Sequence, residues 1–450
     1  MNDSALQRAA VRYWGRKIGK VLDVVISILR KQYGSSKLVV VDPFGGAGTI
    51  VQKLLRIGHK VIYSDPNLYA WLITKYHIGR CKSNKVSFQN VLPEETKALD
   101  PHGKIKRIKL QKLYVIWCPY CKIFREVIRY YWENCMCIAR LVCGHNVECD
   151  DVELEPYYLY PMYELKYPDG KWFYKRRNVR RIDELYTRRA LLVLTAILNK
   201  VKRYSIKGYA GTLYWLALMA IQYNSSKMAR EGCGAWAINS YWIPPKHVEL
   251  NPLKLYINRL KLLMKVKTLS INTTTSLRKT EKIRYEPSLD AAILRLTATQ
   301  LAKSFNKPIA DVIVTDPPHA DETQYFELSF LHNSWYCVHQ NPVQWQKCTE
   351  LQWYKEEIVV NPQQGKGIRE YLELLGQAFA SFRNMLKPNG MLIVMLHEEN
   401  IKLLQKMIDT IISQGYRQLD TITLNAMNVK PIGAKGKNNT TITIIIARKI

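Results

Sequence analysis

The chain has 450 residues, of which 47% are hydrophobic and 23% are charged. This length and composition exclude a small scaffold that needs disulfides and an intrinsically disordered chain, and they allow two or three packed domains. Lys and Arg number 67 against 37 Asp and Glu, which gives a formal net charge of +30. Such an excess attracts phosphate backbones or anionic membranes, so nucleic acid is the first partner that the composition favours.

The sequence offers no segment suited to crossing a membrane. The best apolar run, residues 208–223, contains polar residues and is shorter than the roughly 20 apolar residues that a bilayer requires, so it predicts a buried helix. The N-terminus has no apolar core and no small-residue cleavage site. We therefore expect no secretory signal, no membrane partner and a cytoplasmic location.

Strands and helices alternate in the first hundred residues. A predicted strand at 38–41 runs through the turn Asp42-Pro43-Phe44-Gly45-Gly46-Ala47-Gly48-Thr49 into a helix at 50–57. A second strand at 61–63 is closed by Asp65, a helix follows at 68–78, and a third short strand is predicted at 86–88. Alternation at this spacing predicts an α/β fold with a parallel, Rossmann-like sheet.

This alternation stops at about residue 101 and resumes after 308. Between them lie basic, aromatic and cysteine-bearing stretches and a helical block at 182–227. A strand at 311–315 then ends in Asp316-Pro317-Pro318-His319, and a helix at 371–386, a strand at 391–396, a helix at 401–413 and a hairpin of 419–424 with 440–447 follow. We divide the chain into the first half of the sheet (1–100), a cysteine-rich insertion (101–155), a basic and helical insertion (156–308) and the second half of the sheet (309–450).

The turn after the first strand has the composition of a ligand-binding turn. Gly45, Gly46 and Gly48 let the backbone approach a ligand closely, although a tight turn alone would have the same composition. Asp65, one strand later, can accept hydrogen bonds from both ribose hydroxyls of an adenosine-containing cofactor, or it can cap a helix. The two features together favour a cofactor site.

Asp316 and the two prolines after it end a strand that we place in the same sheet. The prolines rigidly present a carboxylate and backbone carbonyls at the carboxyl edge of the sheet. Those acceptors suit a base amino group, whose lone pair is freed for attack when its hydrogens are held in tetrahedral geometry. The alternative is a proline-rich loop without function.

The sequences DPFGGAGT and DPPH resemble two motifs of the amino-methylating DNA methyltransferases, whose usual forms are DPFxGxGT and DPPY. Further stretches are similar to one family of adenine-specific DNA methylases that contains a zinc ribbon. These stretches are Tyr13 to Lys17, Asp65-Pro66-Asn67, the cysteine-rich region, Glu249 to Pro252, Asp321 to Ser329 and Gly433 to Gly436. The resemblance covers most of the chain and is weakest in the middle.

This resemblance implies an enzyme that transfers a methyl group from S-adenosylmethionine (SAM) to an exocyclic base amine, most simply adenine N6 in DNA. It assigns the cofactor to Asp42, Phe44, Gly45, Gly46, Gly48, Thr49 and Asp65, and catalysis to Asp316, Pro317, Pro318 and His319. His319 replaces the usual Tyr, which stacks on the flipped base. Cytosine N4, an RNA base, and a nucleic-acid-binding protein that has lost activity are the alternatives.

Six of the ten cysteines fall between residues 118 and 149, a clustering that favours a metal over disulfides in a reducing compartment. Cys118 and Cys121 have the spacing of a zinc knuckle. The other two ligands are less regular, with Cys135, Cys137, Cys143, His145 and Cys149 as candidates. We select Cys137 and Cys143 for a structural Zn²⁺ site, and free thiols in a decayed ribbon are the alternative.

Basic residues alternate with aromatic ones at residues 171–177, and Arg180 and Arg181 follow shortly after. This composition suits phosphate contacts combined with base stacking. It is also compatible with a solvated surface. We predict that this stretch contacts nucleic acid and makes its affinity dependent on salt.

Overall fold

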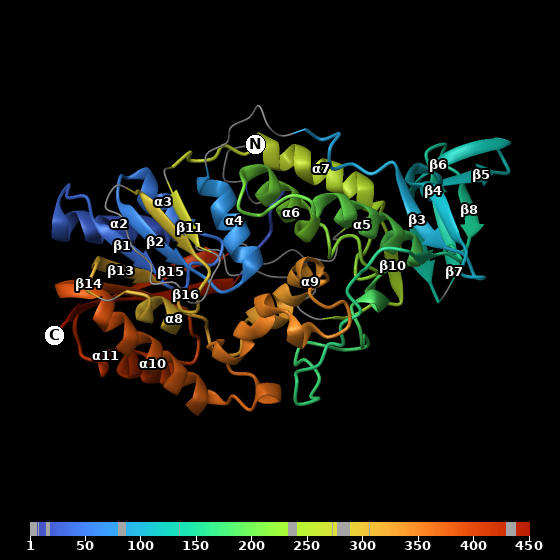
Figure 1. Cartoon of the computed structure of the whole chain (residues 1–450). Coiled ribbons are helices and arrows are strands. Elements are labelled where there is room, and N and C mark those ends of the chain that lie inside the picture. The colour runs from blue at the N-terminus through green and yellow to red at the C-terminus, as the bar shows by residue number, and fades with distance from the viewer. Residues whose placement is uncertain are drawn as a thin grey trace.

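The structure is a computed structural model of the chain. It describes residues 7, 9–14, 19–79, 87–134, 136–232, 241–271, 273–276, 289–305, 307–428 and 438–450. A large α/β sheet lies at one end of the elongated molecule, a group of helices lies in the middle, and a small β region lies at the other end (Figure 1). The first and last segments of the chain both contribute to the large sheet.

In the described part of the chain, the large sheet has eight strands in the order β11-β12-β2-β1-β13-β14-β16-β15. Their bounds are β1 (Val39–Asp42), β2 (Lys60–Ser64), β11 (Thr273–Ser276), β12 (Ala291–Leu294), β13 (Ala310–Thr315), β14 (Leu386–Leu396), β15 (Tyr416–Asn428) and β16 (Asn438–Lys449). The strands from β11 to β14 are parallel, and β16 runs antiparallel to both β14 and β15. From β1 the chain continues to β2 on one side of it, and β13, later in the sequence, pairs with β1 on its other side. The point at which the strand order changes direction therefore lies between β1 and β13.

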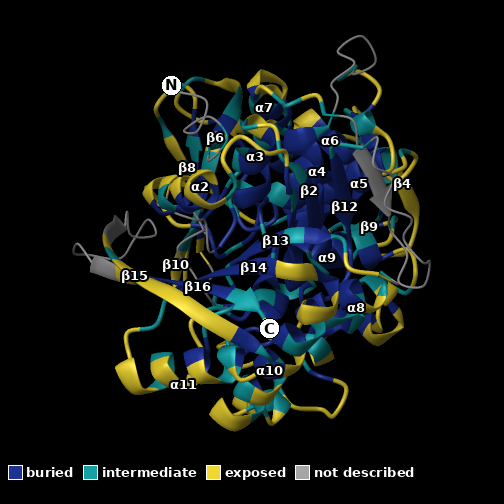
Figure 2. Cartoon of the chain, turned by 90° about the vertical axis from the view of Figure 1, so that its left-hand side faces the viewer, coloured by how far each residue is buried: buried dark blue, intermediate teal, exposed yellow. Residues whose placement is uncertain are grey.

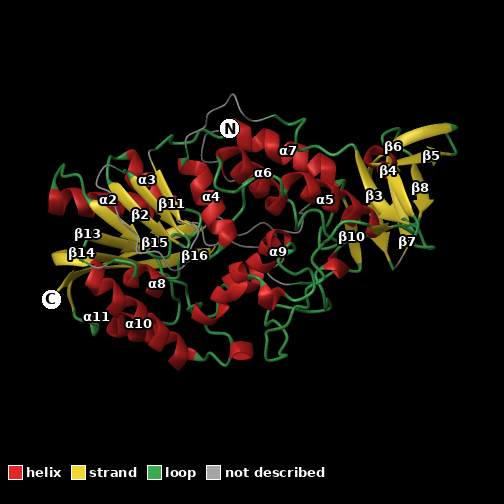
Figure 3. Ribbon diagram, viewed as in Figure 1, coloured by secondary structure: helices red, strands yellow, loops and turns green. Residues whose placement is uncertain are grey.

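Helices cover both faces of this sheet (Figure 3). Alternate strand residues separate into two cores: Val40 packs with α2 (Gly19–Tyr33), α3 (Thr49–Arg56) and α4 (Leu68–Ile78), and Val41 packs with α8 (Ala298–Lys303), α10 (Ile368–Met385) and α11 (Ile401–Ile412). Because both faces are covered, the central strands are continuous apolar runs. The burial colouring shows the buried strands, and β15 forms an exposed edge (Figure 2).

The predicted strands at 38–41, 61–63, 311–315 and 391–396 and the closing hairpin are confirmed. The third predicted strand, 86–88, differs: residue 86 lies outside the described residues, and 87–88 form no strand. Its place beside β2 is taken by β12. Thus β11, β12 and α8 belong to the large sheet and its cover although they fall in the segment 156–308 that we separated as an insertion. The apolar run of β12 is only four residues long, too short to distinguish a strand from a helical turn.

The small β region contains two sheets. One has three strands, β4 (Ile105–Lys109), β3 (Glu95–Leu99) and β9 (Glu155–Pro156). The other combines β5 (Val115–Cys118), β6 (Ile123–Glu133), β7 (Met136–Leu141), β8 (Asn146–Cys149) and β10 (Lys246–Glu249), and the 3₁₀ helix η2 (Leu110–Tyr114) precedes it. We call residues 105–149 the cysteine module.

A buried ion pair ties the cysteine module to the middle helices. Glu249, at the end of β10, accepts from Arg189 Nη1 at 3.1 Å and from the hydroxyl of Tyr114 at 2.9 Å, and both charged side chains are almost fully buried. Arg189 lies in the first turn of α5 (Arg188–Val201). A buried pair that loses one partner leaves an uncompensated charge, so this contact fixes how the module meets the helices.

The middle of the molecule holds α5, α6 (Tyr209–Ala220), α7 (Pro252–Lys265) and α9 (Tyr325–Cys337), with the short 3₁₀ helices η3 (Asp183–Leu185), η4 (Trp345–Lys347), η5 (Thr349–Glu356) and η6 (Pro362–Gln364). The apolar run predicted as a buried helix is α6, and most of its side chains are buried. None of the described helices combines the length and apolar character that a bilayer crossing needs. A disulfide joins Cys337, the last residue of α9, to Cys348, just before η5.

Candidate active site

A cavity of about 180 Å³ opens at the carboxyl ends of β1, β2, β12 and β13. The start of α9, residues around 353–358 and two side chains of α10 complete its walls. This is the edge at which open α/β sheets bind ligands, beside the switch point between β1 and β13. Of the predicted cofactor and catalytic residues, Phe44, Gly46, Asp65, Asp316 and Pro318 line it.

The glycine turn is held from behind by two side chains. The carbonyl of Gly46 accepts hydrogen bonds from the hydroxyl of Tyr63 at 2.8 Å and from Thr74 Oγ1 at 3.1 Å. A Cβ at Gly45 would lie 2.1 Å from the Tyr63 ring, and one at Gly48 would lie 2.5 Å from Thr74 Oγ1. These two glycines therefore face protein atoms, whereas Gly46, at φ +48°, is the glycine that lines the cavity.

Asp65 joins the glycine turn to the next helix. Its Oδ2 accepts from the backbone N–H of Gly46 at 2.9 Å, and its Oδ1 accepts from that of Asn67 at 2.9 Å. Asn67 in turn caps α4 by accepting from the backbone N–H of Tyr69. Each carboxylate oxygen has a second lone pair, so Asp65 can hold the turn and still accept from a ligand.

Asp42 and Thr49 lie behind the cavity wall. Asp42 is fully buried, and its Oδ1 accepts from the hydroxyl of Thr315 at 3.1 Å, which ties the end of β1 to the end of β13. Thr49 is the first residue of α3, and Gly48 precedes it at φ +72° as the N-cap. These residues position the turn.

The loop after β13 is fixed at several points. The hydroxyl of Tyr371, from α10, donates to the carbonyl of Pro318 at 2.8 Å, and the backbone N–H of Val360 donates to the carbonyl of Ala320 at 2.9 Å. Ala320 adopts φ +30°, a region that non-glycine residues rarely occupy. Strain of this kind persists only where the surroundings enforce it, and it concentrates at functional sites.

His319 lies against Asp316 rather than over the cavity. Its Nε2 is 3.1 Å from Asp316 Oδ1, and its Nδ1 accepts from the backbone N–H of His397 at 3.4 Å. The side chain of His319 is 13% exposed, and the ring of His397 meets it edge-on at 5.5 Å. His397 also contacts Glu322, whose backbone N–H donates to the carbonyl of His319. Little of the imidazole face is left to stack on a base.

Several cavity residues were not in the predicted site. Tyr13 and Tyr325 face each other with ring centroids 6.3 Å apart. Burial, and then the Asp65 carboxylate, raise the pKa of Tyr13 well above its usual value, so this phenol stays protonated. Both tyrosines lie in stretches that carry the family resemblance, and this resemblance was the sequence feature that could have indicated them.

No sequence pattern predicted the part of the cavity wall around residues 353–358. Glu356 accepts from Gln300 Nε2 at 2.9 Å and contacts the hydroxyls of Thr297 and Thr299, so it closes the end of β12. Glu357 is 5% exposed and accepts from the backbone N–H of Phe326 at 2.8 Å. Burial raises the pKa of Glu357 to about 7.

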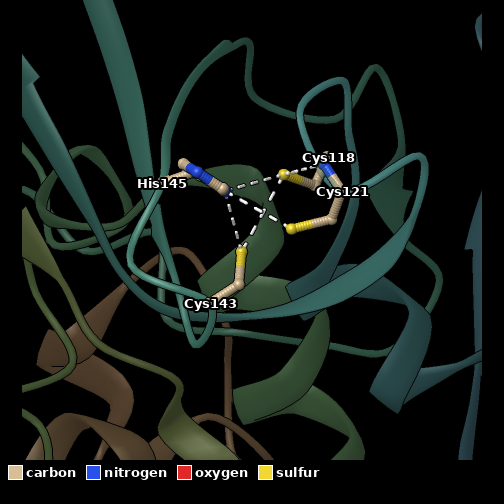
Figure 4. Close-up of side chains that lie close together, drawn as sticks. All are labelled: Cys118, Cys121, Cys143 and His145. Carbon is tan, nitrogen blue, oxygen red and sulfur yellow. Dashed lines mark hydrogen bonds between the residues drawn. The ribbon is translucent and has the colours of Figure 1, made fainter.

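In the cysteine module, Cys118 and Cys121, from the turn between β5 and β6, meet Cys143 and His145, from the turn between β7 and β8 (Figure 4). The Cys118 and Cys143 sulfurs are 3.8 Å apart, and His145 Nδ1 lies 3.4, 3.4 and 3.5 Å from the sulfurs of Cys118, Cys121 and Cys143. Tetrahedral Zn²⁺ with Zn–S of about 2.3 Å and Zn–N of about 2.0 Å requires separations of about 3.8 Å between two sulfurs and about 3.5 Å between sulfur and nitrogen. The four side chains fit a zinc ion.

The cluster differs from the predicted ligand set at one position. Cys137 lies on β7, with its sulfur 2.9 Å from that of Cys149 on the neighbouring strand β8, whereas His145 occupies the fourth position of the cluster. Cys135 lies outside the described residues. Desolvation opposes the Cys118 thiolate, but hydrogen bonds from the backbone N–H groups of Cys121 and Tyr120 and from the thiols of Cys121 and Cys143 together lower the pKa of Cys118 to about 7. The thiolate is the metal-binding form.

Two rings of the basic and aromatic stretch at 171–177 contact other protein groups, whereas the third, Tyr174, is 38% exposed. Trp172 lies between Lys166 and Arg176, with the two cationic groups 4.3 and 3.9 Å from its ring centroid, and Phe173 is buried. The turn between β5 and β6 is different, because Trp117 and Phe124 in the flanking strands are 47% and 69% exposed. The more exposed aromatic surface therefore lies on the cysteine module.

Fold and cavity together define an α/β protein with a cavity at the switch point of a doubly wound sheet. Comparison with known proteins adds little: no family model matches the chain, and no curated protein matches it. A solved structure from Thermus thermophilus, described as a "Putative DNA Modification Methylase", aligns at 17% identity over 34% of this chain and 51% of its own, with a TM-score of 0.20. This chain thus spans about half of that protein.

Two further solved structures are similar at the same level. The Thermus thermophilus protein "Complexed with S-Adenosyl-L-Methionine" gives 15% identity, 34% and 50% coverage and a TM-score of 0.19. A "16S rRNA (adenine(1408)-N(1))-methyltransferase" from Catenulisporales acidiphilia gives 9% identity, 37% and 66% coverage and a TM-score of 0.20.

Proposed function

We propose that this chain is a SAM-dependent methyltransferase that acts on an exocyclic amine of a nucleic-acid base, most simply adenine N6 in DNA. One observation carries the proposal. Asp65 and Gly46 at the ends of two parallel strands, and Asp316 at the end of a third, line a single cavity. A turn suited to a nucleoside cofactor and a carboxylate suited to a target amine therefore lie in the same cavity, where a cofactor and a base could meet.

The cavity has features that suit the cofactor. Asp65 would accept hydrogen bonds from the ribose hydroxyls. Gly46 has no side chain, so its backbone is open to the cofactor, and a Cβ there would lie 3.3 Å from the Tyr13 ring. Phe44 and the tyrosine pair of Tyr13 and Tyr325 add apolar and aromatic surface. SAM supplies an electrophilic methyl group on a sulfonium.

The chain's own contribution to the reaction is positioning and electrostatics. Asp316 would accept a hydrogen from the target amine as positive charge develops on the nitrogen, an interaction that strengthens toward the transition state. The pinned loop from Asp316 to Ala320 keeps that carboxylate in place without reorganisation. No covalent enzyme intermediate is needed, because the amine attacks the methyl group directly.

The cysteine module is proposed to hold a structural Zn²⁺ on Cys118, Cys121, Cys143 and His145, because their separations fit a tetrahedral site. Its exposed rings at Trp117 and Phe124, together with the net charge of +30, support nucleic acid as the partner. Stacking rings and cations are what a nucleic-acid strand requires. The role that we expected of residues 171–177 thus has better support on the module.

The proposal is tested by incubating the purified chain with methyl-labelled SAM and separate DNA and RNA pools, followed by identification of the modified nucleoside. We expect N6-methyladenine in DNA and none with Asp316→Ala, which should still bind SAM. N4-methylcytosine or a modified RNA base would select the corresponding alternative substrate. Salt-dependent nucleic-acid binding without transfer or SAM binding would identify a binding protein instead.

A further inference from the structure

The hydrogen bonds around His319 determine which ring nitrogen carries the proton. Nδ1 accepts from the backbone N–H of His397 at 3.4 Å, so it has no hydrogen in the neutral ring. In the neutral ring the hydrogen is then on Nε2, which lies 3.1 Å from Asp316 Oδ1, within hydrogen-bond distance. The proposed catalytic carboxylate thus receives a directed hydrogen bond from a side chain that does not line the cavity.

We propose that His319 is a positioning residue that orients the Asp316 carboxylate through its Nε2–H, and that it does not stack on the target base. This inference rests on the methyltransferase function proposed above. With Oδ1 held by the imidazole, the carboxylate can rotate little about its terminal bond, and Oδ2 is the oxygen directed to the amine. In the usual pair, a carboxylate orients a histidine by accepting a hydrogen bond from its ring N–H. Here the same kind of hydrogen bond would let the histidine orient the carboxylate.

The surroundings of His319 support a fixed ring. The backbone of His397 belongs to the chain just after β14, the strand next to β13, so the acceptor and donor of this bond are held by neighbouring strands. The carbonyl of His319 accepts from the backbone N–H of Glu322, and Pro318 and Ala320 on either side are bonded to Tyr371 and Val360. The imidazole is therefore positioned from several directions before any ligand binds.

Two substitutions separate positioning from stacking. His319→Gln retains an N–H donor at about the reach of Nε2 but has no ring, whereas His319→Phe retains a ring but has no donor. We expect His319→Gln to keep most of the methyl transfer rate. We expect His319→Phe to lower kcat by about 10–100-fold, the loss of a hydrogen bond to a charged group, with SAM affinity unchanged. The opposite order of activities would overturn the proposal.

A second measurement does not need turnover, so it separates failure of this inference from failure of the proposed function. Imidazole ¹⁵N correlation spectra of the full chain, with the His319 signal assigned from its loss in His319→Gln, report the tautomer directly. We expect the Nε2–H form in the wild type and a shifted Nε2 resonance in Asp316→Asn. An Nδ1–H tautomer, or a spectrum indifferent to Asp316→Asn, would show that the bond does not form.

Discussion

The cavity and the cysteine module both gather chemically active side chains in turns, but the two are held together differently. The turns around Asp65 and Asp316 extend from buried parallel strands and are fixed by Tyr63, Thr74 and Tyr371. The four side chains proposed as zinc ligands lie on two hairpin turns with exposed rings beside them. The cavity should thus keep its shape without a ligand, whereas the module should depend on the zinc ion that we propose it holds.

The largest expected effect is the loss of that ion. Cys118→Ser, or a strong chelator, should remove about one equivalent of zinc and unfold the module locally, because zinc-binding free energy in small sites is about 10–16 kcal/mol and is folding free energy. Hydrogen exchange should accelerate within residues 105–149 and stay unchanged in β1, β2 and β13. Cys137→Ser is the matched control and should retain the metal. Equal zinc loss from both variants would restore Cys137 as a ligand.

A smaller effect is expected from substitution of Asp65, a charged residue of the cavity wall. Asp65→Ala should weaken SAM binding by about 1–3 kcal/mol, through loss of the ribose contact and of the bond to Gly46 N–H. Asp65→Asn leaves one acceptor oxygen and should lose less. Calorimetry on both folded variants measures the difference, and unchanged affinity in Asp65→Ala would exclude this residue from the cofactor site.

A comparable change, but in stability, is expected at Glu357. Its folded pKa of about 7 lies above its usual 4.5, so the carboxyl's favourable contribution is complete below about pH 4.5 and is lost as the pH rises toward 7. Glu357→Gln mimics the neutral form and should gain on the order of 1–3 kcal/mol of unfolding free energy at pH 8 relative to pH 5. Urea titrations at both pH values test this, with exposed Glu373→Gln as the control. A gain independent of pH would contradict the assignment.

The smallest effect concerns the exposed rings. Trp117→Ala and Phe124→Ala should each weaken binding of a single-stranded oligonucleotide by about 1 kcal/mol, the lower end of what base stacking contributes, and binding should fall steeply with salt. Trp172→Ala serves as a comparison, because that ring is already covered by Lys166 and Arg176. Fluorescence anisotropy across a salt series measures all three. A larger loss at Trp172 than at Trp117 would return the nucleic-acid contact to residues 171–177.

The sequence predicted the large sheet well because its strands are buried on both faces and end in recognisable turns. Asp65 and Asp316 follow those strands, and the rule that ligands bind at the carboxyl edge brought them together. The wall at Glu356 and Glu357 could not be predicted, since it depends on how a segment far along the chain folds back over β12. Local spacing gives no information about such a contact.

The fourth position of the cysteine cluster shows a related limit. Counting cysteines could not separate His145 from Cys137, because both are near Cys143 in the sequence. In an antiparallel sheet, the hairpin turns β5–β6 and β7–β8 lie at the same end, and residue 145 is in a turn whereas Cys137 is on a strand opposite Cys149. Strand register, rather than residue type, decides the ligand.

The packing of Gly45 and Gly48 has a consequence for how their motif evolves. A side chain at Gly45 would meet Tyr63, and one at Gly48 would meet Thr74, so each glycine is compatible with its partner's size. Across related sequences, a larger residue at position 45 should occur together with a smaller one at position 63, whereas Gly48, at φ +72°, is required by its backbone conformation as well as by Thr74. Loss of Tyr63 or Thr74 would also remove a bond to the Gly46 carbonyl, so such paired replacements should be rare in active members. Covariation at these positions would therefore distinguish lineages that retain the proposed cofactor turn from those that have lost it.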